Sequence, residues 1–562
     1  MALETGSSGT KIIMKTTFKL RLACFALVLL AFASPSQSEE TEKRIAFVVG
    51  NPAYQAGQLA TPANDAGLIA QTLQAAGFDV TGARDLDGET LRSAFHDFLD
   101  KAQASGPDTV AFVYLAGYGV QLHNENYFVP VDAKIASASD VAAEALRISD
   151  YTMRLAGLPL KASFIVLDAG RATPFAKSGQ PLAGGLALAE AAPNMLMAFN
   201  AAPGTVAPDE SGPYGAYAQA LTEMIREGGL TPSQVFDGVR LRVSEATKGA
   251  QVPWSASRIS APFVFFERAK DAPPPALETS RIDAMRSRPM RDLGAQDAYA
   301  AAIERDSMQG YEEFVAAYPS DPLANRVRAL LAARREAITW RQTCQVNTPD
   351  AYWSYLNRYP QGPHAADAQR RLASLDVPEE PPASFAPITY EVPPPPPQEI
   401  IYVDRPVLVL SDPYFGFVPP PPIDFLAPPP TYLVFLPPPP PVELFVLPVP
   451  VFVPVPVWIN PPPYVVAPPG NVIFNNIHNT TVINDNTNVI NPGAPGTAGV
   501  GTGVAAGVAA GAAAGAIAAK VALPPSVARK VTMFGGQGGP QVKTGQPVPG
   551  APAGPPASPR RR

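Results

Sequence analysis

The sequence predicts an α/β fold built on a six-stranded, mostly parallel sheet flanked by helices. Two observations between residues 44 and 268 support this prediction: short runs of β-branched and aromatic residues, and segments with helical apolar spacing that separate them. Parallel strands need such crossovers, so the alternation favours one sheet with helices on both faces. The predicted strands are Ile45–Val49, Phe78–Thr81, Thr109–Tyr114, Phe164–Leu167, Met195–Phe199 and Phe263–Phe266.

The segments between these strands carry the apolar period of amphipathic helices. Ala66, Ile69, Ala70 and Leu73 follow one another at intervals of three, one and three residues, which places them on one helical face. The same pattern returns within residues 91–99. A domain of this length has ample sequence to bury a core between helices and sheet.

Two short loops follow the third and fourth predicted strands. The first, 115–119, has the sequence L-A-G-Y-G, and the second, 167–171, has the sequence L-D-A-G-R. In an open α/β sheet, ligands and chemistry gather beyond the carboxyl ends of the strands. These two loops are therefore the candidate site.

Both loops resemble motifs of the caspase and metacaspase-like peptidases, in which one strand ends in G-H-G and another in D-x-C. In this chain Tyr118 stands at the histidine position and Gly170 at the cysteine position. Further resemblances to the family follow in the same order along the chain, at 45–54, 64–66, 126–132 and 251–254. The resemblance implies a caspase-like domain over residues 44–268.

The resemblance also implies that catalysis is lost. Cysteine peptidases need a thiolate, which a histidine generates or stabilises, and glycine offers no nucleophile. A phenol such as that of Tyr118, with an ordinary pKa near 10, is a poor base at neutral pH. We expect no catalytic residue and no enzyme activity. The alternative is a peptidase that uses other residues, for which Thr173 and His123 are the nearest candidates.

Two aspartates remain as candidate peptide-binding residues. In relatives that this domain resembles, the aspartate two residues before the nucleophile helps to bind a basic side chain, and that position is Asp168 here. A second such aspartate corresponds to Asp65. The resemblance thus implies a peptide or protein partner with Arg or Lys side chains, recognised by charge-assisted hydrogen bonds. The alternative is structural: Asp65 as a helix cap and Asp168 as a loop hydrogen-bonding group.

A helical module is predicted at 296–375, after a linker at 269–295. Its sequence repeats at an offset of 41 residues, and each copy is a helical hairpin interrupted by a Tyr-Pro pair, Tyr318-Pro319 and Tyr359-Pro360. The repeats resemble tetratricopeptide-like repeats. Both a helical spacer and a peptide-binding module fit this pattern.

The remaining chain predicts a low-complexity tail. Residues 376–470 are rich in proline, which favours extended polyproline II structure, and residues 471–562 are rich first in Asn and then in Gly and Ala. Within 500–519 a glycine recurs every fourth residue. Such a stripe permits close helix packing in a membrane, and a flexible linker is the alternative. A further hypothesis makes this tail the working part of a structural envelope protein.

Residues 14–38 resemble an export signal, with Lys15, Lys19 and Arg21 ahead of an apolar run, so Met14 is a candidate start beside Met1. We expect an exported bacterial protein, periplasmic or attached to the cell envelope. The formal net charge of -6 argues against a nucleic-acid partner. No Cys/His cluster or phosphate-binding glycine loop occurs, so we expect neither a metal nor another cofactor. The expected function is binding or scaffolding.

Overall fold

The computed structural model describes residues 42–210, 212–272 and 287–421, together with four short strands beyond them. The predicted signal segment 14–38 and the glycine-striped segment 500–519 lie outside the described residues. None of the helices in the described part is long and apolar enough to cross a membrane.

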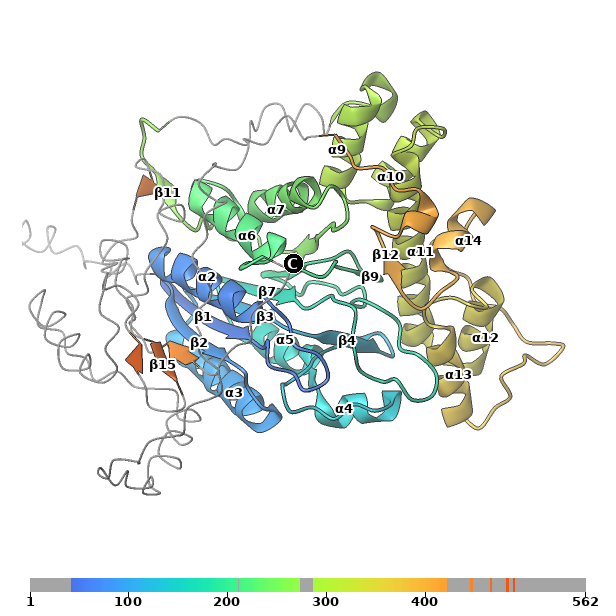
Figure 1. Cartoon of the computed structure of the whole chain (residues 1–562), viewed down its shortest axis with the longest axis horizontal. Coiled ribbons are helices and arrows are strands. Elements are labelled where there is room, and N and C mark those ends of the chain that lie inside the picture. The colour runs from blue at the N-terminus through green and yellow to red at the C-terminus, as the bar shows by residue number, and fades with distance from the viewer. Residues whose placement is uncertain are drawn as a thin grey trace, which may run out of the picture. The chain divides into compact units, whose positions relative to one another are not determined.

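The predicted α/β fold is confirmed. The central sheet has the strand order β2-β1-β3-β7-β8-β10, in which only β10 runs antiparallel to its neighbour. Strands β2, β1, β3 and β7 of this sheet are labelled in Figure 1. Three further strands, β13, β15 and β16, extend the sheet beyond β2. The strands of the central sheet are β1 (Lys43–Gly50), β2 (Asp79–Arg84), β3 (Thr109–Ala116), β7 (Ala162–Asp168), β8 (Met195–Phe199) and β10 (Trp254–Ser257).

Helices cover both faces of this sheet, because the central strands bury both sets of alternating side chains. In β3, Val110, Phe112 and Tyr114 enter one core cluster, whereas Ala111 and Val113 enter the other. The first cluster lies under α2 (Pro62–Ala75), α6 (Ala216–Glu227) and α7 (Pro232–Ala246). The second lies under α3 (Gly88–Ser105) and α5 (Ile148–Ala156).

The prediction of a strand at Phe263–Phe266 is wrong. The sixth strand is β10, and the aromatic run that follows it is a loop packed on the first core cluster. Phe263 and Phe265 have ring centroids 5.6 and 5.5 Å from that of Phe164. A short apolar run has the same composition in a buried strand and in a buried loop, so its sequence does not separate the two.

Shorter elements complete this first domain. They are β4 (Gly119–Leu122), β5 (Glu125–Phe128), η1 (Ala138–Asp140), α4 (Val141–Glu144), β6 (Leu146–Arg147), β9 (Thr205–Val206) and β11 (Glu267–Arg268). Strands β4, β5 and β6 form a small antiparallel sheet directly after the Tyr118 loop.

The following region is helical, and its two sequence repeats share local geometry. Asp306 and Asn347 both adopt left-handed backbone conformations at helix ends, and each accepts a 2.6 Å hydrogen bond from the tyrosine five residues later. The helix before each Tyr-Pro pair ends at the residue preceding the tyrosine. The elements are η2 (Met290–Asp292), α9 (Ala295–Arg305), α10 (Met308–Ala317), α11 (Ala324–Val346), α12 (Pro349–Arg358) and α13 (Ala365–Ser374).

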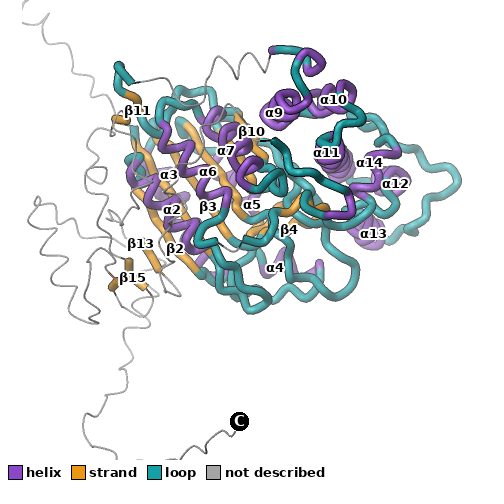
Figure 2. Tube along the Cα trace, turned by 45° about the horizontal axis from the view of Figure 1, so that its top comes forward, coloured by secondary structure: helices purple, strands orange, loops and turns teal. Residues whose placement is uncertain are grey.

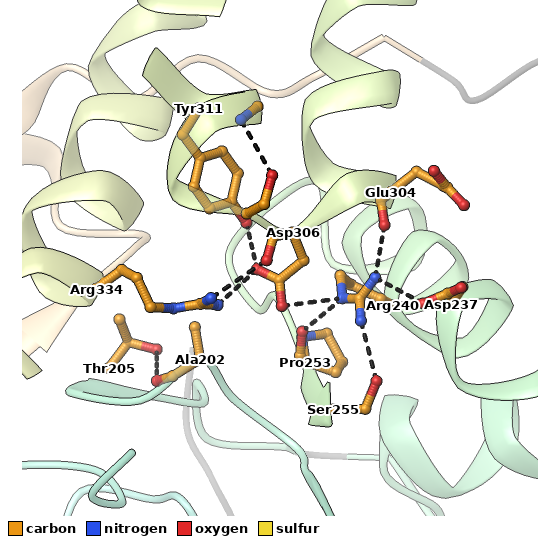
Figure 3. A network of polar contacts seen from close by, with 12 residues as sticks. Ala202, Thr205, Asp237, Arg240, Pro253, Ser255, Glu304, Asp306, Tyr311 and Arg334 are labelled. Carbon is orange, nitrogen blue, oxygen red and sulfur yellow. Dashed lines mark hydrogen bonds and ion pairs between the residues drawn. The ribbon is translucent and has the colours of Figure 1, made fainter. Parts of the chain in front are cut away.

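The helices pack on the β10 side of the first domain (Figure 2), and Ala337 of α11 shares a core cluster with Trp254 of β10. A buried polar network joins the two regions (Figure 3). The guanidinium of Arg240 in α7 donates to the Glu304 carbonyl oxygen (2.8 Å) and lies 3.6 Å from a carboxylate oxygen of Asp306. Asp306 also pairs with Arg334 of α11 at 2.7 Å.

Residues 376–421, the first part of the predicted low-complexity region, form a strap folded over the helices. The strap contains α14 (Pro397–Val403), β12 (Leu408–Val409) and η3 (Pro413–Phe415). Glu399 of α14 forms a 2.9 Å ion pair with Arg335 of α11, and β12 pairs in parallel with β9. Beyond the strap lie β13 (Phe445–Leu447), β14 (Val465–Val466), β15 (Val482–Asn484) and β16 (Val489–Ile490).

Candidate functional site

The two loops singled out in the sequence lie side by side at the carboxyl edge of the sheet. Strands β3 and β7 are neighbours, with Ala116 in register with Asp168. The Gly119 amide donates a 2.8 Å hydrogen bond to the Ala169 carbonyl oxygen. The structure thus brings together the positions that the family resemblance assigned to the base and the nucleophile.

Tyr118 is buried in an aromatic cluster. Its ring meets those of Tyr54 and Phe175 edge to face, with centroids 4.8 and 5.5 Å away. The Tyr54 hydroxyl accepts from the Tyr118 amide (3.1 Å) and donates to the Val129 carbonyl oxygen (2.8 Å). Burial, reinforced by Asp209, raises the pKa of Tyr118. The phenol is thus an even weaker acid here than in water.

Gly170 is held by the side chain of Asn200. Its amide donates to Asn200 Oδ1 at 2.8 Å, and its carbonyl oxygen accepts from the Ala207 amide at 2.8 Å. A Cβ atom at position 170 would lie only 2.9 Å from Asn200 Oδ1. Any side chain at this position, cysteine included, therefore requires Asn200 to shift.

Asp168 is fully engaged by the chain's own side chains. One carboxylate oxygen accepts from the Tyr114 hydroxyl and the other pairs with the Arg171 guanidinium, both at 2.8 Å. Arg171 also pairs with Glu210 at 2.9 Å, and only 6% of its side chain is exposed. A basic side chain therefore already occupies the predicted acidic site, and it belongs to the same loop.

Asp65 and Glu210 converge on the first residues of α6. Asp65 lies in the first turn of α2, but it does not cap that helix; it accepts a 2.7 Å hydrogen bond from the Gly215 amide, the N-cap of α6. Glu210 accepts from the Ala216 amide at 2.9 Å. The two carboxylates thus satisfy amides that an α-helix leaves without intrahelical partners.

We call Asp65, Asp168, Arg171 and Glu210 the acidic cluster. Burial raises the pKa of Asp65 well above its usual value, and the nearby Asp168 and Glu210 carboxylates add to this effect. Burial also raises the pKa of Asp168, against the opposing influence of Arg171. The cluster thus contains three carboxyl groups and a single guanidinium, so its acidic groups outnumber its basic group.

Three residues of this arrangement were missed by the sequence argument. Tyr114 carried a signal, because a tyrosine in an apolar strand must find a partner for its hydroxyl when it is buried. Asn200 directly follows β8, at the same carboxyl edge as the two loops. Glu210 lies in an irregular loop, and nothing in its sequence context identified it.

His123 and Thr173, the candidates for an alternative hydrolase, have different contacts in the structure. His123 sits in the β4–β5 turn; burial lowers its pKa, and the charged side chains that act on it are Asp367, Arg370 and Arg371 of the α13 region. Thr173 accepts a 3.3 Å hydrogen bond from the Phe175 amide. Within the described ranges, no group of three or more His, Cys, Asp or Glu side chains is placed to hold a metal ion.

Comparison with known families defines the class of this site. The family model described as "Caspase domain" matches residues 43–264. The sheet, its helical layers and the two loops all lie within that range, so residues 43–264 form a caspase-like domain. A search of curated proteins finds no match to the chain.

Proposed function

We propose that this protein is a non-catalytic relative of the caspase-like cysteine peptidases that acts by binding and scaffolding at the bacterial cell envelope. The observation that carries the proposal is Gly170. The nucleophile position has no side chain, and Asn200 Oδ1 occupies the space that a Cβ atom would need. Without a nucleophile there is no covalent route to peptide cleavage.

The surroundings of Tyr118 support the same proposal. A general base must reach the proton that it removes and must have a pKa near the working pH. The Tyr118 ring is instead packed between Tyr54 and Phe175, and burial moves its pKa further from neutrality. An active peptidase built on His123 and Thr173 is the less favoured alternative. Burial lowers the pKa of His123, and the charged side chains that act on it belong to α13, not to the loop that holds Thr173.

The acidic cluster suggests how a basic partner would bind. A peptide Arg or Lys can reach Asp168 only by displacing Arg171, which already supplies a buried guanidinium. This arrangement favours a structural role for Asp65 and Asp168 in the free protein. A peptide or protein with basic side chains remains the proposed partner, bound in exchange for Arg171.

The envelope location is proposed from the sequence. It depends on the export signal at 14–38 and, for membrane contact, on residues 500–519. A purely structural envelope protein, in which the proline-rich tail is the working part, is the second alternative. Deleting residues 422–562 separates it from our proposal, because a tail-based function is then lost. The deletion also removes β13, which pairs with β2, and β14, which pairs with β11, so circular dichroism of the truncated chain must show a folded domain before its function is compared.

Cleavage and binding assays on the full chain test the proposal separately. We expect no turnover of peptides with Arg, Lys or Asp before the scissile bond, for wild type and for H123A and T173A alike. Turnover that disappears in H123A or T173A contradicts the non-catalytic assignment. For binding, we expect Arg171→Met to bind an Arg-containing peptide about tenfold more tightly than wild type, since the internal competitor is gone.

The matched control is the double variant R171M/D168N, which removes the acceptor as well. We expect it to lose this gain in affinity. Equal peptide affinity in wild type, R171M and R171M/D168N contradicts recognition at the acidic cluster, while it leaves the absence of cleavage untouched.

A further inference from the structure

The strap holds a run of five prolines, Pro393–Pro397, between two points fixed to the helices. On the upstream side, the Arg358 guanidinium lies 4.4 Å from the centroid of the Tyr390 ring and donates a 3.0 Å hydrogen bond to the Val392 carbonyl oxygen. On the downstream side, Glu399 is buried in its ion pair with Arg335. The run itself lies between these two anchors.

The run stands on the surface in an extended conformation. Pro396 has φ -66° and ψ 154°, the values of polyproline II helix. Four of the five prolines are exposed, and Pro395 is partly buried. Among the described residues, no hydrogen bond reaches the carbonyl oxygens of Pro393, Pro394 and Pro395. Because Pro397 already begins α14, the four prolines before it, at about 3.1 Å per residue, present roughly 12 Å of polyproline II helix to solvent.

The exposed apolar surface continues onto α14. Pro397 is the first residue of that helix, and Ile401, four residues later, lies on the same helical face. Ile401 is 51% exposed, whereas Tyr402 and Val403 are buried against the core. We call Pro393–Pro397 together with Ile401 the proline ridge.

We propose that the proline ridge is a docking site for a protein domain whose groove is lined by aromatic rings. Polyproline II segments are recognised in this way because their prolines pack between flat rings and their carbonyl oxygens accept hydrogen bonds from the groove. The anchors at Val392 and Glu399 hold the run in its binding conformation before contact, which lowers the entropic cost of association. Exposed Glu391 at the upstream end favours a basic residue beside the groove.

The ridge lies outside the caspase-like domain, so this inference does not depend on whether that domain cleaves peptides. A simple strut that carries the chain from the helices to β12 would also need stiff prolines. It would not need Ile401 exposed in line with them. The two roles therefore differ in what happens when Ile401 is changed.

The test is a titration of the full chain with a WW domain that binds uninterrupted proline runs, followed through the NMR signals of the labelled WW domain. We expect wild type to shift the signals of the aromatic groove, and both Pro394→Gly and Ile401→Lys to weaken binding by about fivefold or more. Two matched controls should bind as wild type does: Pro420→Gly in the next proline run, and Met153→Lys at an exposed apolar position of α5.

Each outcome decides the proposal. Pro394, Ile401 and Met153 are exposed and Pro420 is partly buried, and we expect unchanged thermal unfolding midpoints that exclude misfolding as the cause. Absence of groove shifts with wild type overturns the proposal. Affinity that falls with Pro420→Gly but not with Pro394→Gly also overturns it, because binding then belongs to another proline run. Affinity insensitive to both Pro394→Gly and Ile401→Lys overturns it as well, and assigns the ridge a strut role only.

Discussion

Replacing Arg171 by methionine removes the only cation from the acidic cluster and keeps a side chain of similar length. Asp168, with 1% of its side chain exposed, loses a 2.8 Å ion pair, and Glu210 loses one of 2.9 Å. Removing one partner of a buried ion pair leaves uncompensated charge and costs about 3–5 kcal/mol. Against a domain stability of about 5–15 kcal/mol, this is a large loss.

The pH dependence follows from the direction of the pKa shifts. Burial raises the pKa of Asp65 and of Asp168 in the folded protein, so the folded state holds these protons more tightly than the unfolded chain does. The associated stability is fully present below the unfolded pKa, near 3.9, and is lost as pH rises through the folded pKa. Arg171 lowers the pKa of Asp168, so R171M raises it further. The deficit of R171M is therefore largest at neutral pH and shrinks toward pH 5.

Urea unfolding of full-length wild type and R171M at pH 7 and pH 5, followed by tryptophan fluorescence, measures both effects. The control is R341M, which breaks the 3.0 Å pair between Arg341 and Glu190 at the surface, where Glu190 is 69% exposed. We expect that variant to lose less than about 1 kcal/mol at either pH. A loss in R171M as small as in R341M, or one that does not change between the two pH values, refutes the cluster argument.

Three further predictions concern positions away from this ion pair. Gly170→Cys, alone or with Tyr118→His, should cost about 1 kcal/mol in urea unfolding, because the shift of Asn200 removes the acceptor of the Gly170 amide; Gly67→Ala, which meets no atom within 4 Å in α2, should instead stabilise by up to about 1 kcal/mol. Asp306→Ala should cost about 3–5 kcal/mol by the same measurement, since it strips the interface of its shared carboxylate; Asp306→Asn should lose less, because it keeps the Tyr311 bond. Arg335→Met should speed limited proteolysis within 376–421, as judged by mass spectrometry, because Glu399 loses its buried partner.

Much of the sheet could be predicted from the sequence because parallel strands buried on both faces are apolar throughout. All the predicted strands except the last coincide with observed ones, to within a few residues at their ends. The last failed because β10, W-S-A-S, is short and polar at the edge of the sheet, whereas the neighbouring F-V-F-F run is more apolar and forms a loop. The apolar residues of 263–266 correctly indicated a buried segment, but they did not indicate whether that segment pairs as a strand.

The site could be predicted in part. Adjacency of the two loops followed from the rule that parallel strands end at one edge, and the structure agrees. Two contacts of the acidic cluster could not be predicted: the Gly215 amide that donates to Asp65, and Glu210, which pairs with Arg171. Gly215 and Glu210 are remote in sequence from Asp65 and reach it through the packing of α6 on α2. The docking of the strap on the helices could not be predicted either. Its proline content indicated an extended chain, but its contacts with the helices depend on Arg335 and Arg358, which nothing in the sequence distinguishes from the other arginines of that region.

In the proposed non-catalytic domain, the two loops and the acidic cluster are held by contacts that also stabilise the fold. Asn200 closes the space over Gly170, the Tyr118 ring fills the space between Tyr54 and Phe175, and Arg171 neutralises carboxylates that α6 needs at its first turn. If the domain is non-catalytic, as we propose, selection for stability alone is sufficient to maintain this arrangement. A catalytic site at these loops would then require changes at several packed positions together.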